Sequence, residues 1–163
     1  MTLAAIALGT NLNSKFGDRE ANLREAVRRI AALGVVRSVS SFFDTEPVGF
    51  LDQPRFLNGA LALETELEPA ALMRALLDVE RSMGRERERA VAKGPRVIDL
   101  DLLLYGDVVM ATEELTLPHP EMQERRFVLE PLAEIAPEWV HPVLRLTVRE
   151  MLERVTADRG LHG

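Results

Sequence analysis

The sequence contains no cysteine, so it can form neither disulfide bonds nor thiolate metal sites. This absence fits a reducing compartment, and the N-terminal residues lack the basic leader and cleavage site of a signal peptide. No apolar run approaches the roughly 20 residues that a membrane-spanning helix needs. We therefore expect a cytoplasmic protein that has no membrane partner.

An excess of basic residues is also missing, since 20 Lys and Arg stand against 26 Asp and Glu, giving a formal net charge of −6. That charge argues against nucleic acid as a partner. The chain does have 47% hydrophobic residues over 163 positions, enough for a single domain over 1–163 with one sizeable core. Basic residues gather locally between Arg81 and Arg96, which favours a small anionic ligand, and we expect a monomer.

The pattern of apolar residues predicts an α+β fold. Strands are expected over 2–8, 35–46 and 56–65 and around Asp99, with helices over 19–33 and from Pro69 onward. This βαββαβ order is typical of a ferredoxin-like core, with a mostly antiparallel sheet and helices on one face. A C-terminal extension is expected to add a hairpin near 103–117, a loop at 118–126 and helices near 127–134 and 148–158.

Some helix ends carry recognisable signals. Asp18 is expected to cap the first helix, and Gly34 is suited to end it. Thr147 and Glu150 have the spacing of a capping box before the last helix.

The most informative stretch runs from Lys93 to Tyr105, where a loop with cations leads into an apolar strand. Asp99 and Asp101 are two positions apart, so their side chains share one face of the strand, roughly 6.5–7 Å apart. The opposite face is expected to carry Ile98, Leu100, Leu102 and Leu104. Buried charges need a partner, and here it is either a divalent cation such as Mg²⁺ or the nearby Arg96. The spacing alone leaves both interpretations open.

Further groups suit the same kind of ligand, and each also has a simpler interpretation. Glu80, at the edge of a helical apolar stripe, either reaches a ligand or stays exposed in solvent. The arginines of 84–93 either clamp phosphate or pair with the glutamates between them. His119 either donates to a phosphate or supports its loop. The segment 45–58 either encloses a flat heteroaromatic ring or only connects strands.

Taken in order, these elements resemble the signature of the 6-hydroxymethyl-7,8-dihydropterin pyrophosphokinase family of folate biosynthesis. The strongest match is Gly94-Pro95-Arg96-x-x-Asp99-Leu100-Asp101-Leu102-Leu103. Further matches along the chain are Leu8-Gly9-Thr10-Asn11-Leu12, Asp52-Gln53-Pro54, Phe56-Leu57-Asn58, Glu80, Gly84-Arg85-x-Arg87, Pro118-His119 and Arg125-x-Phe127. The family has a ferredoxin-like α+β fold, in agreement with the predicted order of elements.

The resemblance implies that the β,γ-pyrophosphoryl group of Mg-ATP moves to the pterin hydroxymethyl oxygen and that AMP leaves. It implies two Mg²⁺ ions on Asp99 and Asp101. The implied ATP contacts are Glu80, Arg85, Arg87, Arg96, Ile98, His119 and Arg125, of which Arg85 and Arg96 join the two aspartates as catalytic residues. The implied pterin contacts are Thr45, Glu46, Val48, Phe56, Asn58, Asp99 and Phe127, with the two phenylalanines on either side of the ring.

Two other classes of function stay open from the residues themselves. A ferredoxin-like regulatory domain that only binds a small molecule explains the fold but leaves the aspartate pair beside Gly-Pro-Arg without a role. A metal-dependent phosphodiesterase would use the pair, but the chain has only 3 histidines to build a larger metal centre. The pyrophosphokinase is therefore the leading prediction.

Overall fold

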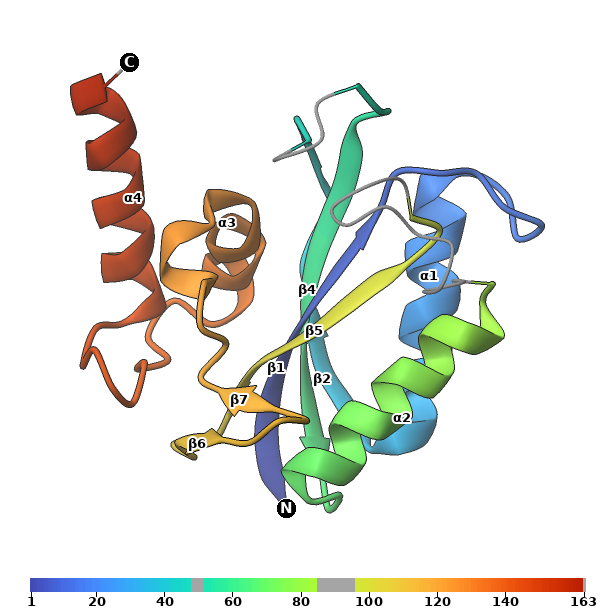
Figure 1. Ribbon diagram of the computed structural model, residues 1–163, viewed down its shortest axis with the longest axis horizontal. Helices are drawn as coiled ribbons and strands as arrows, with labels where there is room; N and C mark the ends of the chain where they lie inside the picture. Colours follow the sequence, from blue (N-terminus) through green and yellow to red (C-terminus); the bar gives the residue numbers. More distant parts are fainter. Residues whose placement is uncertain (48–51, 85–95, 163) are drawn as a thin grey trace.

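The computed structural model describes residues 1–47, 52–84 and 96–162, with side chains described as far as residue 157. Its core elements, in chain order, are β1 (Thr2–Thr10), α1 (Arg19–Ile30), β2 (Val35–Val39), β3 (Phe43–Thr45), β4 (Phe56–Thr65), α2 (Pro69–Ser82) and β5 (Asp99–Tyr105). They form an antiparallel sheet in the order β2-β4-β1-β5, and β3 pairs with β4 along the same edge as β2 (Figure 1). The predicted α+β class and the order of the core elements are confirmed.

The strand predicted over 35–46 is wrong in its extent, because the chain leaves the ladder between β2 and β3. The Ser40 N–H still donates to the Ala60 carbonyl oxygen at 2.9 Å, but the Ala60 N–H donates to the Ser40 Oγ, also at 2.9 Å, instead of to a backbone carbonyl. Ser41 turns away from the sheet, and its N–H and Oγ–H both donate to the carboxylate of Glu134, at 2.7 and 2.6 Å. Side-chain hydrogen bonds of serine compete with the backbone ladder, which explains the break.

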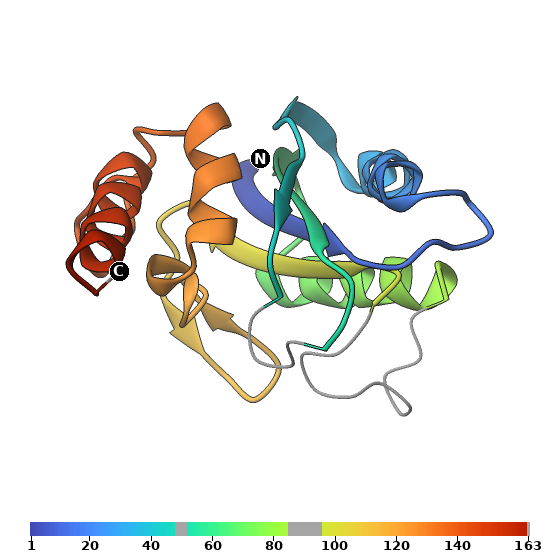
Figure 2. The same ribbon diagram turned by 90° about the horizontal axis from the view of Figure 1, so that it is seen from above.

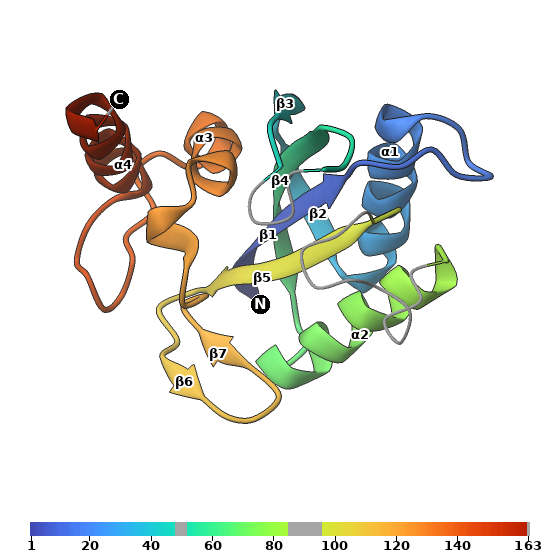
Figure 3. The same cartoon turned by 45° about the horizontal axis from the view of Figure 1, so that its top comes forward.

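Helices cover both faces of the sheet. α1 and α2 pack on one face over a core that includes Leu23, Ile30, Leu72 and Leu76. On the opposite face lies α3 (Arg126–Ile135), and α4 (Val148–His162) packs against the outer side of α3 (Figures 2 and 3). The second core cluster there includes Leu129, Leu132, Val148 and Met151. The expectation that the core helices lie on one face is confirmed by α1 and α2. The helices of the C-terminal extension bury their apolar stripes away from that face.

The pairing of β5 with β1 contains a β-bulge. Ala5 pairs with Leu104 and Ile6 with Leu102, so Leu103 is an extra residue in β5. An extra residue shifts every later side chain to the other face of the sheet. Leu104 therefore packs with Leu103 in the core under α3, and the prediction that it shares a face with Leu100 and Leu102 is wrong.

The predicted caps are confirmed. Asp18 Oδ1 accepts the Ala21 N–H at 2.9 Å, and a short 3₁₀ turn, η1 (Ala31–Leu33), extends α1 to the predicted end. Thr147 and Glu150 exchange hydrogen bonds at 2.9 and 3.1 Å as a capping box for α4.

The predicted hairpin is narrower than expected. It consists of β6 (Met110–Ala111) and β7 (Thr116–Leu117), because residues 103–105 belong to β5. The turn η2 (Met122–Glu124) lies in the predicted loop. Within the described ranges, no helix is both long enough and apolar enough to cross a membrane.

Candidate active site

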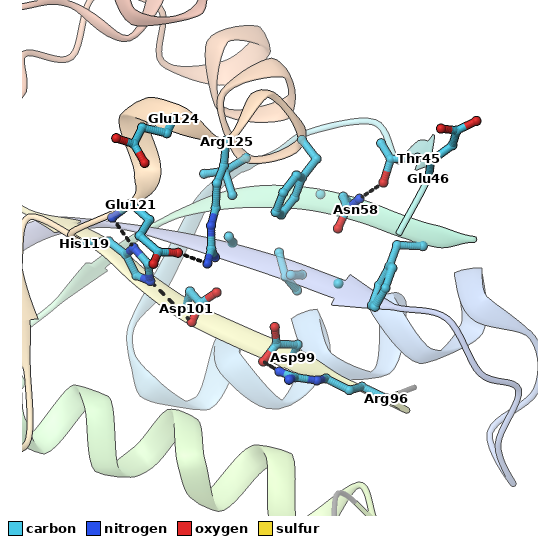
Figure 4. Close-up of a pocket in the computed structure, with 17 residues that line it drawn as sticks. Thr45, Glu46, Asn58, Arg96, Asp99, Asp101, His119, Glu121, Glu124 and Arg125 are labelled. Carbon is cyan, nitrogen blue, oxygen red and sulfur yellow. Dashed lines mark hydrogen bonds and ion pairs between the residues drawn. The ribbon is translucent and has the colours of Figure 1, made fainter. Parts of the chain in front are cut away.

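A cleft of about 540 Å³ lies over the face of the sheet that α3 covers only in part. β1, β3, β4 and β5 contribute to it, together with the residues around η2 (Figure 4). Its charged and polar lining consists of Thr45, Glu46, Asn58, Arg96, Asp99, Asp101, His119, Glu121, Glu124 and Arg125, and its aromatic lining of Phe56 and Phe127. The cleft thus gathers segments that are far apart in the sequence.

Small side chains form the floor beside the two aspartates. Asp99 pairs with Gly9 on β1, and Asp101 pairs with Ala7. A Cβ added to Gly9 would lie 3.0 Å from Oδ1 of Asn58, so glycine leaves the space that this amide occupies. The carboxylates of β5 therefore stand beside an open floor, which gives a ligand access to them.

Arg96 forms an ion pair with Asp99, with Nη1 and Oδ1 3.1 Å apart. The side chains of Arg96 and Asp99 are 16% and 29% exposed. The Nε of Arg96 is buried, and it has no hydrogen-bond partner in the described structure. An unmet buried donor beside a carboxylate is a place where an acceptor oxygen of a ligand would be stabilised.

His119 is held in one tautomer by its own loop. Its Nδ1 accepts the N–H of Glu121 at 3.2 Å, so the neutral ring carries its proton on Nε2. Nε2 lies 3.9 Å from Oδ1 of Asp101 and faces the cleft (Figure 4). Burial lowers the pKa of His119 below its ordinary value, the Arg125 cation lowers it further, and Glu121 and Asp99 oppose the shift. At neutral pH the ring is therefore an uncharged N–H donor.

Arg125 is positioned by two neighbours. Its Nη2 contacts the Glu121 carboxylate one helical turn earlier, and its guanidinium lies 5.7 Å from the centroid of the Phe127 ring. The stacked ring and the carboxylate together fix the direction of the cation. The guanidinium thus points into the cleft on the same side as His119 (Figure 4).

The other end of the cleft is lined by an amide, two aromatic rings and the Glu46 carboxylate. Asn58 Nδ2 donates to Thr45 Oγ1, which joins β4 to β3. Asn58 is 6% exposed, so its amide has a fixed orientation at the cleft wall. Phe56 and Phe127 line the same cleft. This combination suits a flat heteroaromatic ligand, which stacks on rings and forms hydrogen bonds at its edge.

Most predicted site residues are brought together here. The cleft contains Thr45, Glu46, Phe56, Asn58, Arg96, Asp99, Asp101, His119, Arg125 and Phe127. Val48, Arg85 and Arg87 lie outside the described residues. Glu80 and Ile98 do not line the cleft, because both are buried below the sheet, with 1% and 0% exposure. Glu80 Oε2 accepts the Leu100 N–H at 2.7 Å, so the alternative of an exposed helix-edge glutamate is wrong.

Sequence reasoning missed two carboxylates of the cleft, those of Glu121 and Glu124. Glu121 stands four residues before Arg125, a spacing that signals an ion pair on a helical turn. Carboxylates outnumber guanidinium groups among the described residues that line the cleft. The cleft as described therefore favours a cation.

The donors fit Mg²⁺ better than a metal held by the protein alone. Among residues 1–47, 52–84 and 96–162, no group of three or more His, Cys, Asp or Glu side chains is arranged to hold a metal ion. Mg²⁺ commonly binds one or two carboxylates and keeps its other positions for water and phosphate. Asp99 and Asp101, side by side over an open floor, match that requirement.

Comparison with known proteins agrees with this chemistry. The sequence model of the family described as 7,8-dihydro-6-hydroxymethylpterin-pyrophosphokinase matches residues 5–137. The 2-amino-4-hydroxy-6-hydroxymethyldihydropteridine pyrophosphokinase of Bacillus subtilis is 47% identical over 135 residues, which are 82% of this chain and 77% of that protein. The protein of the same name from Methylorubrum extorquens is 45% identical over 157 residues, covering 95% of this chain and 94% of that protein.

Some relatives are much longer than this chain. The folic acid synthesis protein fol1 of Schizosaccharomyces pombe is 40% identical over 156 residues, which are 96% of this chain but 21% of that protein. The crystal structure of wild-type Plasmodium falciparum HPPK-DHPS has the same fold over 96% of this chain and 45% of that one, with a TM-score of 0.74 and 14% identity. Since the family model and the bacterial relatives span most of the sequence, this chain belongs to the 7,8-dihydro-6-hydroxymethylpterin-pyrophosphokinase family.

Proposed function

We propose that the cleft is the active site of this ATP-dependent diphosphotransferase of folate biosynthesis. The enzyme transfers the pyrophosphoryl group of ATP to the hydroxymethyl group of 6-hydroxymethyl-7,8-dihydropterin. One observation carries the placement of the site. Asp99 and Asp101 lie between two cationic side chains of one cleft, Arg96 beside Asp99 and Arg125 near His119 (Figure 4). Asn58, Phe56 and Phe127 line the same cleft. This combination matches a polyanionic donor and a flat acceptor that meet over the carboxylates.

The pterin lies at the aromatic end in this proposal. Asn58, with its orientation fixed by Thr45, forms hydrogen bonds with the ring edge, while Phe56 and Phe127 stack on the two ring faces. Glu46 lines the same end, and its carboxylate can accept from the amino or ring N–H groups of the pterin. Val48, which lies outside the described residues, stays a predicted contact.

The triphosphate lies at the end with the two carboxylates, between Arg96 and Arg125. Arg96 and Arg125 donate to phosphate oxygens, and the neutral His119 donates through Nε2–H. Arg125 leaves its contact with Glu121 when a phosphate takes its place. Arg85 and Arg87 stay predicted contacts outside the described residues. Glu80 and Ile98 stay predicted contacts as well, although in this structure both are covered.

Asp99 and Asp101 would hold two Mg²⁺ ions, which supply charge neutralisation for the phosphates and a lowered pKa for the acceptor hydroxyl. Asp99 also borders the aromatic end, so it orients the hydroxymethyl group. The hydroxymethyl oxygen forms a bond with the β-phosphorus as the bond from that phosphorus to the α-phosphate oxygen breaks. AMP leaves, and the hydroxyl proton passes to water. Catalysis by this chain is therefore positioning and charge stabilisation.

The test is the nucleotide product. With Mg-ATP and the hydroxymethyl dihydropterin, the protein should form AMP and no ADP, and a chelator should abolish turnover. Asp99→Ala and Asp101→Ala should each lower the rate by about 10²-fold or more, because charge neutralisation is the main catalytic effect. Thermal unfolding checks that each variant is folded. ADP as the product would refute the reaction, and full activity of both variants would refute the site.

We further propose that residues 1–163 act as one domain and as a monomer in the cytoplasm, without nucleic acid as a partner. The absence of cysteine supports the compartment, and the net charge of −6 supports the lack of a nucleic-acid partner. The monomeric state stays a prediction. Sedimentation equilibrium should give the 18.2 kDa mass of one chain.

A further inference from the structure

Asn11 lies just after β1 and is 2% exposed. Its amide nitrogen donates to Gln53 Oε1 at 2.8 Å and to the carbonyl oxygen of Pro54 at 3.0 Å. Its Oδ1 accepts the backbone N–H of Arg96 at 2.7 Å. Both donors of this amide and one acceptor site are thus used, in contacts with two segments that are distant in the sequence.

The contact with Arg96 is reinforced by the backbone. The Asn11 N–H donates to the Arg96 carbonyl oxygen at 3.0 Å, and Thr10 Oγ1 lies within 3.3 Å of the same oxygen. The N–H and the carbonyl of Arg96 are therefore both held at the end of β1. Its side chain reaches Asp99 from this fixed point.

The position of Asn11 follows from the sheet order. β1 lies between β4 and β5, so the residue after β1 stands between the segments that enter those two strands. Pro54 is two residues before Phe56, the first residue of β4, and Arg96 is three residues before Asp99, the first residue of β5. One side chain thus connects the strand with pterin contacts to the strand with phosphate contacts.

We propose that Asn11 is a positioning residue that sets the spacing between the pterin and the triphosphate. The inference rests on the function proposed above, because it assigns the two substrates to the two ends of the cleft. Asn11 is absent from the residues that line the cleft, so it acts through Pro54 and Arg96. A displacement of about 1 Å between reacting groups lowers a rate by roughly 10²-fold, so a single buried amide can control turnover.

The competing explanation is that Asn11 only stabilises the fold. Thr65 supplies a matched control, since it is 0% exposed and uses its hydroxyl twice, donating to Leu33 O at 2.8 Å and accepting from Leu67 N at 3.1 Å. Thr65 is the last residue of β4, at the end away from Phe56 and Asn58. Thr65→Val therefore removes buried hydrogen bonds without touching the cleft.

The experiment compares Asn11→Ala, Asn11→Asp and Thr65→Val with the unchanged protein, by AMP formation and by thermal unfolding. Asn11→Ala should lower kcat by about 10- to 100-fold. Thr65→Val should keep kcat within about twofold at a similar loss of melting temperature, since its change lies far from the cleft. Asn11→Asp keeps the acceptor for the Arg96 N–H but cannot donate to Pro54. It should raise the KM for the pterin and leave the KM for ATP near its original value.

The outcomes separate the two hypotheses. If the unchanged protein forms no AMP, the proposed function fails, and this inference fails with it. If the unchanged protein forms AMP but the Asn11 variants have the kinetics of Thr65→Val, only the role of Asn11 is overturned. An equal rise of both KM values in Asn11→Asp would also overturn it. Should Asn11→Ala not fold, the near-isosteric Asn11→Asp carries the comparison.

Discussion

At the scale of single residues, Glu121 is one of two carboxylates in the cleft that the sequence did not point to, and it has the closer contacts with the proposed ligand donors. Its backbone N–H sets the tautomer of His119, and its carboxylate contacts Arg125. Both partners are proposed donors to the triphosphate. The carboxylate therefore pairs with a guanidinium that the proposed triphosphate contact requires, and it adds negative charge where we propose that the triphosphate binds.

Glu121→Gln should consequently bind ATP more tightly. The ion pair is half exposed, and such pairs contribute little, so the KM for ATP should fall by about two- to fivefold. Steady-state kinetics at low ionic strength would measure the change. Glu130→Gln, which breaks the comparable Arg126–Glu130 pair on α3 at 2.9 Å, is the control and should leave this KM unchanged. A higher KM for ATP in Glu121→Gln would mean that the carboxylate positions Arg125 rather than competes for it.

Residue spacing correctly predicted the direction of some side chains but not of others. Alternation along a strand correctly placed Asp99 and Asp101 on one face, because strand geometry is local. It could not tell whether Glu80 faces the cleft, since a helix-edge position leaves the neighbouring element undetermined. The partner of Glu80, the Leu100 N–H, becomes visible only when α2 lies against β5. The position of a side chain whose partner is distant in the sequence therefore could not be predicted without the fold.

At the scale of elements, Gly34 was correctly predicted to follow the first helix, but the structure requires glycine there for a different physical reason. The sequence suggested a glycine that ends α1, which usually requires a left-handed backbone. In the structure Gly34 is extended, with a φ of 167°, and a Cβ there would lie 2.3 Å from the carbonyl oxygen of Glu64. The glycine is thus required by the close approach of η1 to the end of β4.

Gly34→Ala should destabilise the fold by roughly 1–3 kcal/mol or more, as an overpacked site does. Urea unfolding measures the loss. Ala32→Ser, at an exposed position in the same turn, should cost less than about 0.5 kcal/mol. Turnover of the folded Gly34→Ala variant should be normal, because Glu64 lies at the end of β4 away from Phe56. A stability equal to that of the unchanged protein would show that the turn relaxes easily.

The ends and the register of the strands depended on which hydrogen-bond partners competed for the backbone, and the pattern of apolar residues does not show this. The apolar run after Gly34 predicted one strand, but the Ser40 hydroxyl takes the place of a backbone acceptor opposite Ala60, and Ser41 donates to Glu134. The run in β5 predicted regular alternation, but the extra Leu103 moves Leu104 to the other face. In both cases the composition was correct for a strand, and the register was decided by neighbours across the sheet.

At the scale of the whole molecule, the free energy of unfolding depends on pH through His119 and His141. Burial lowers the pKa of His119 and of His141 below their ordinary values. His141 is 5% exposed, and its Nδ1 accepts the N–H groups of Val143 and Leu144 at 3.2 and 3.0 Å, which requires an unprotonated nitrogen. The turn between α3 and α4 thus needs a neutral ring.

The free energy of unfolding should therefore fall as the pH decreases from about 7 to about 5. A histidine with a lowered pKa binds fewer protons in the folded state than in the unfolded state, whose pKa is about 6.5, so acid favours unfolding. Urea unfolding at several pH values checks the direction. His141→Gln should reduce the dependence, and a stability that rises toward pH 5 would contradict the argument. Carboxylates with a lowered pKa, such as Glu25 at about 2, lose their stabilising contribution mainly as the pH falls below their ordinary value of 4.5, at the acid edge of this window.

The hydrogen bond from the Leu100 N–H to Glu80 has a consequence for how copies of this protein meet. β5 is an outer strand of the sheet, and outer strands offer unpaired backbone groups to which another chain can add a strand. Glu80 places a carboxylate on one of these groups, and α2 lies against the same strand. The Glu80 carboxylate thus also hinders the addition of a strand from another copy. Replacing Glu80 by alanine would leave the Leu100 N–H at the sheet edge without this acceptor, and we expect the variant to aggregate more readily.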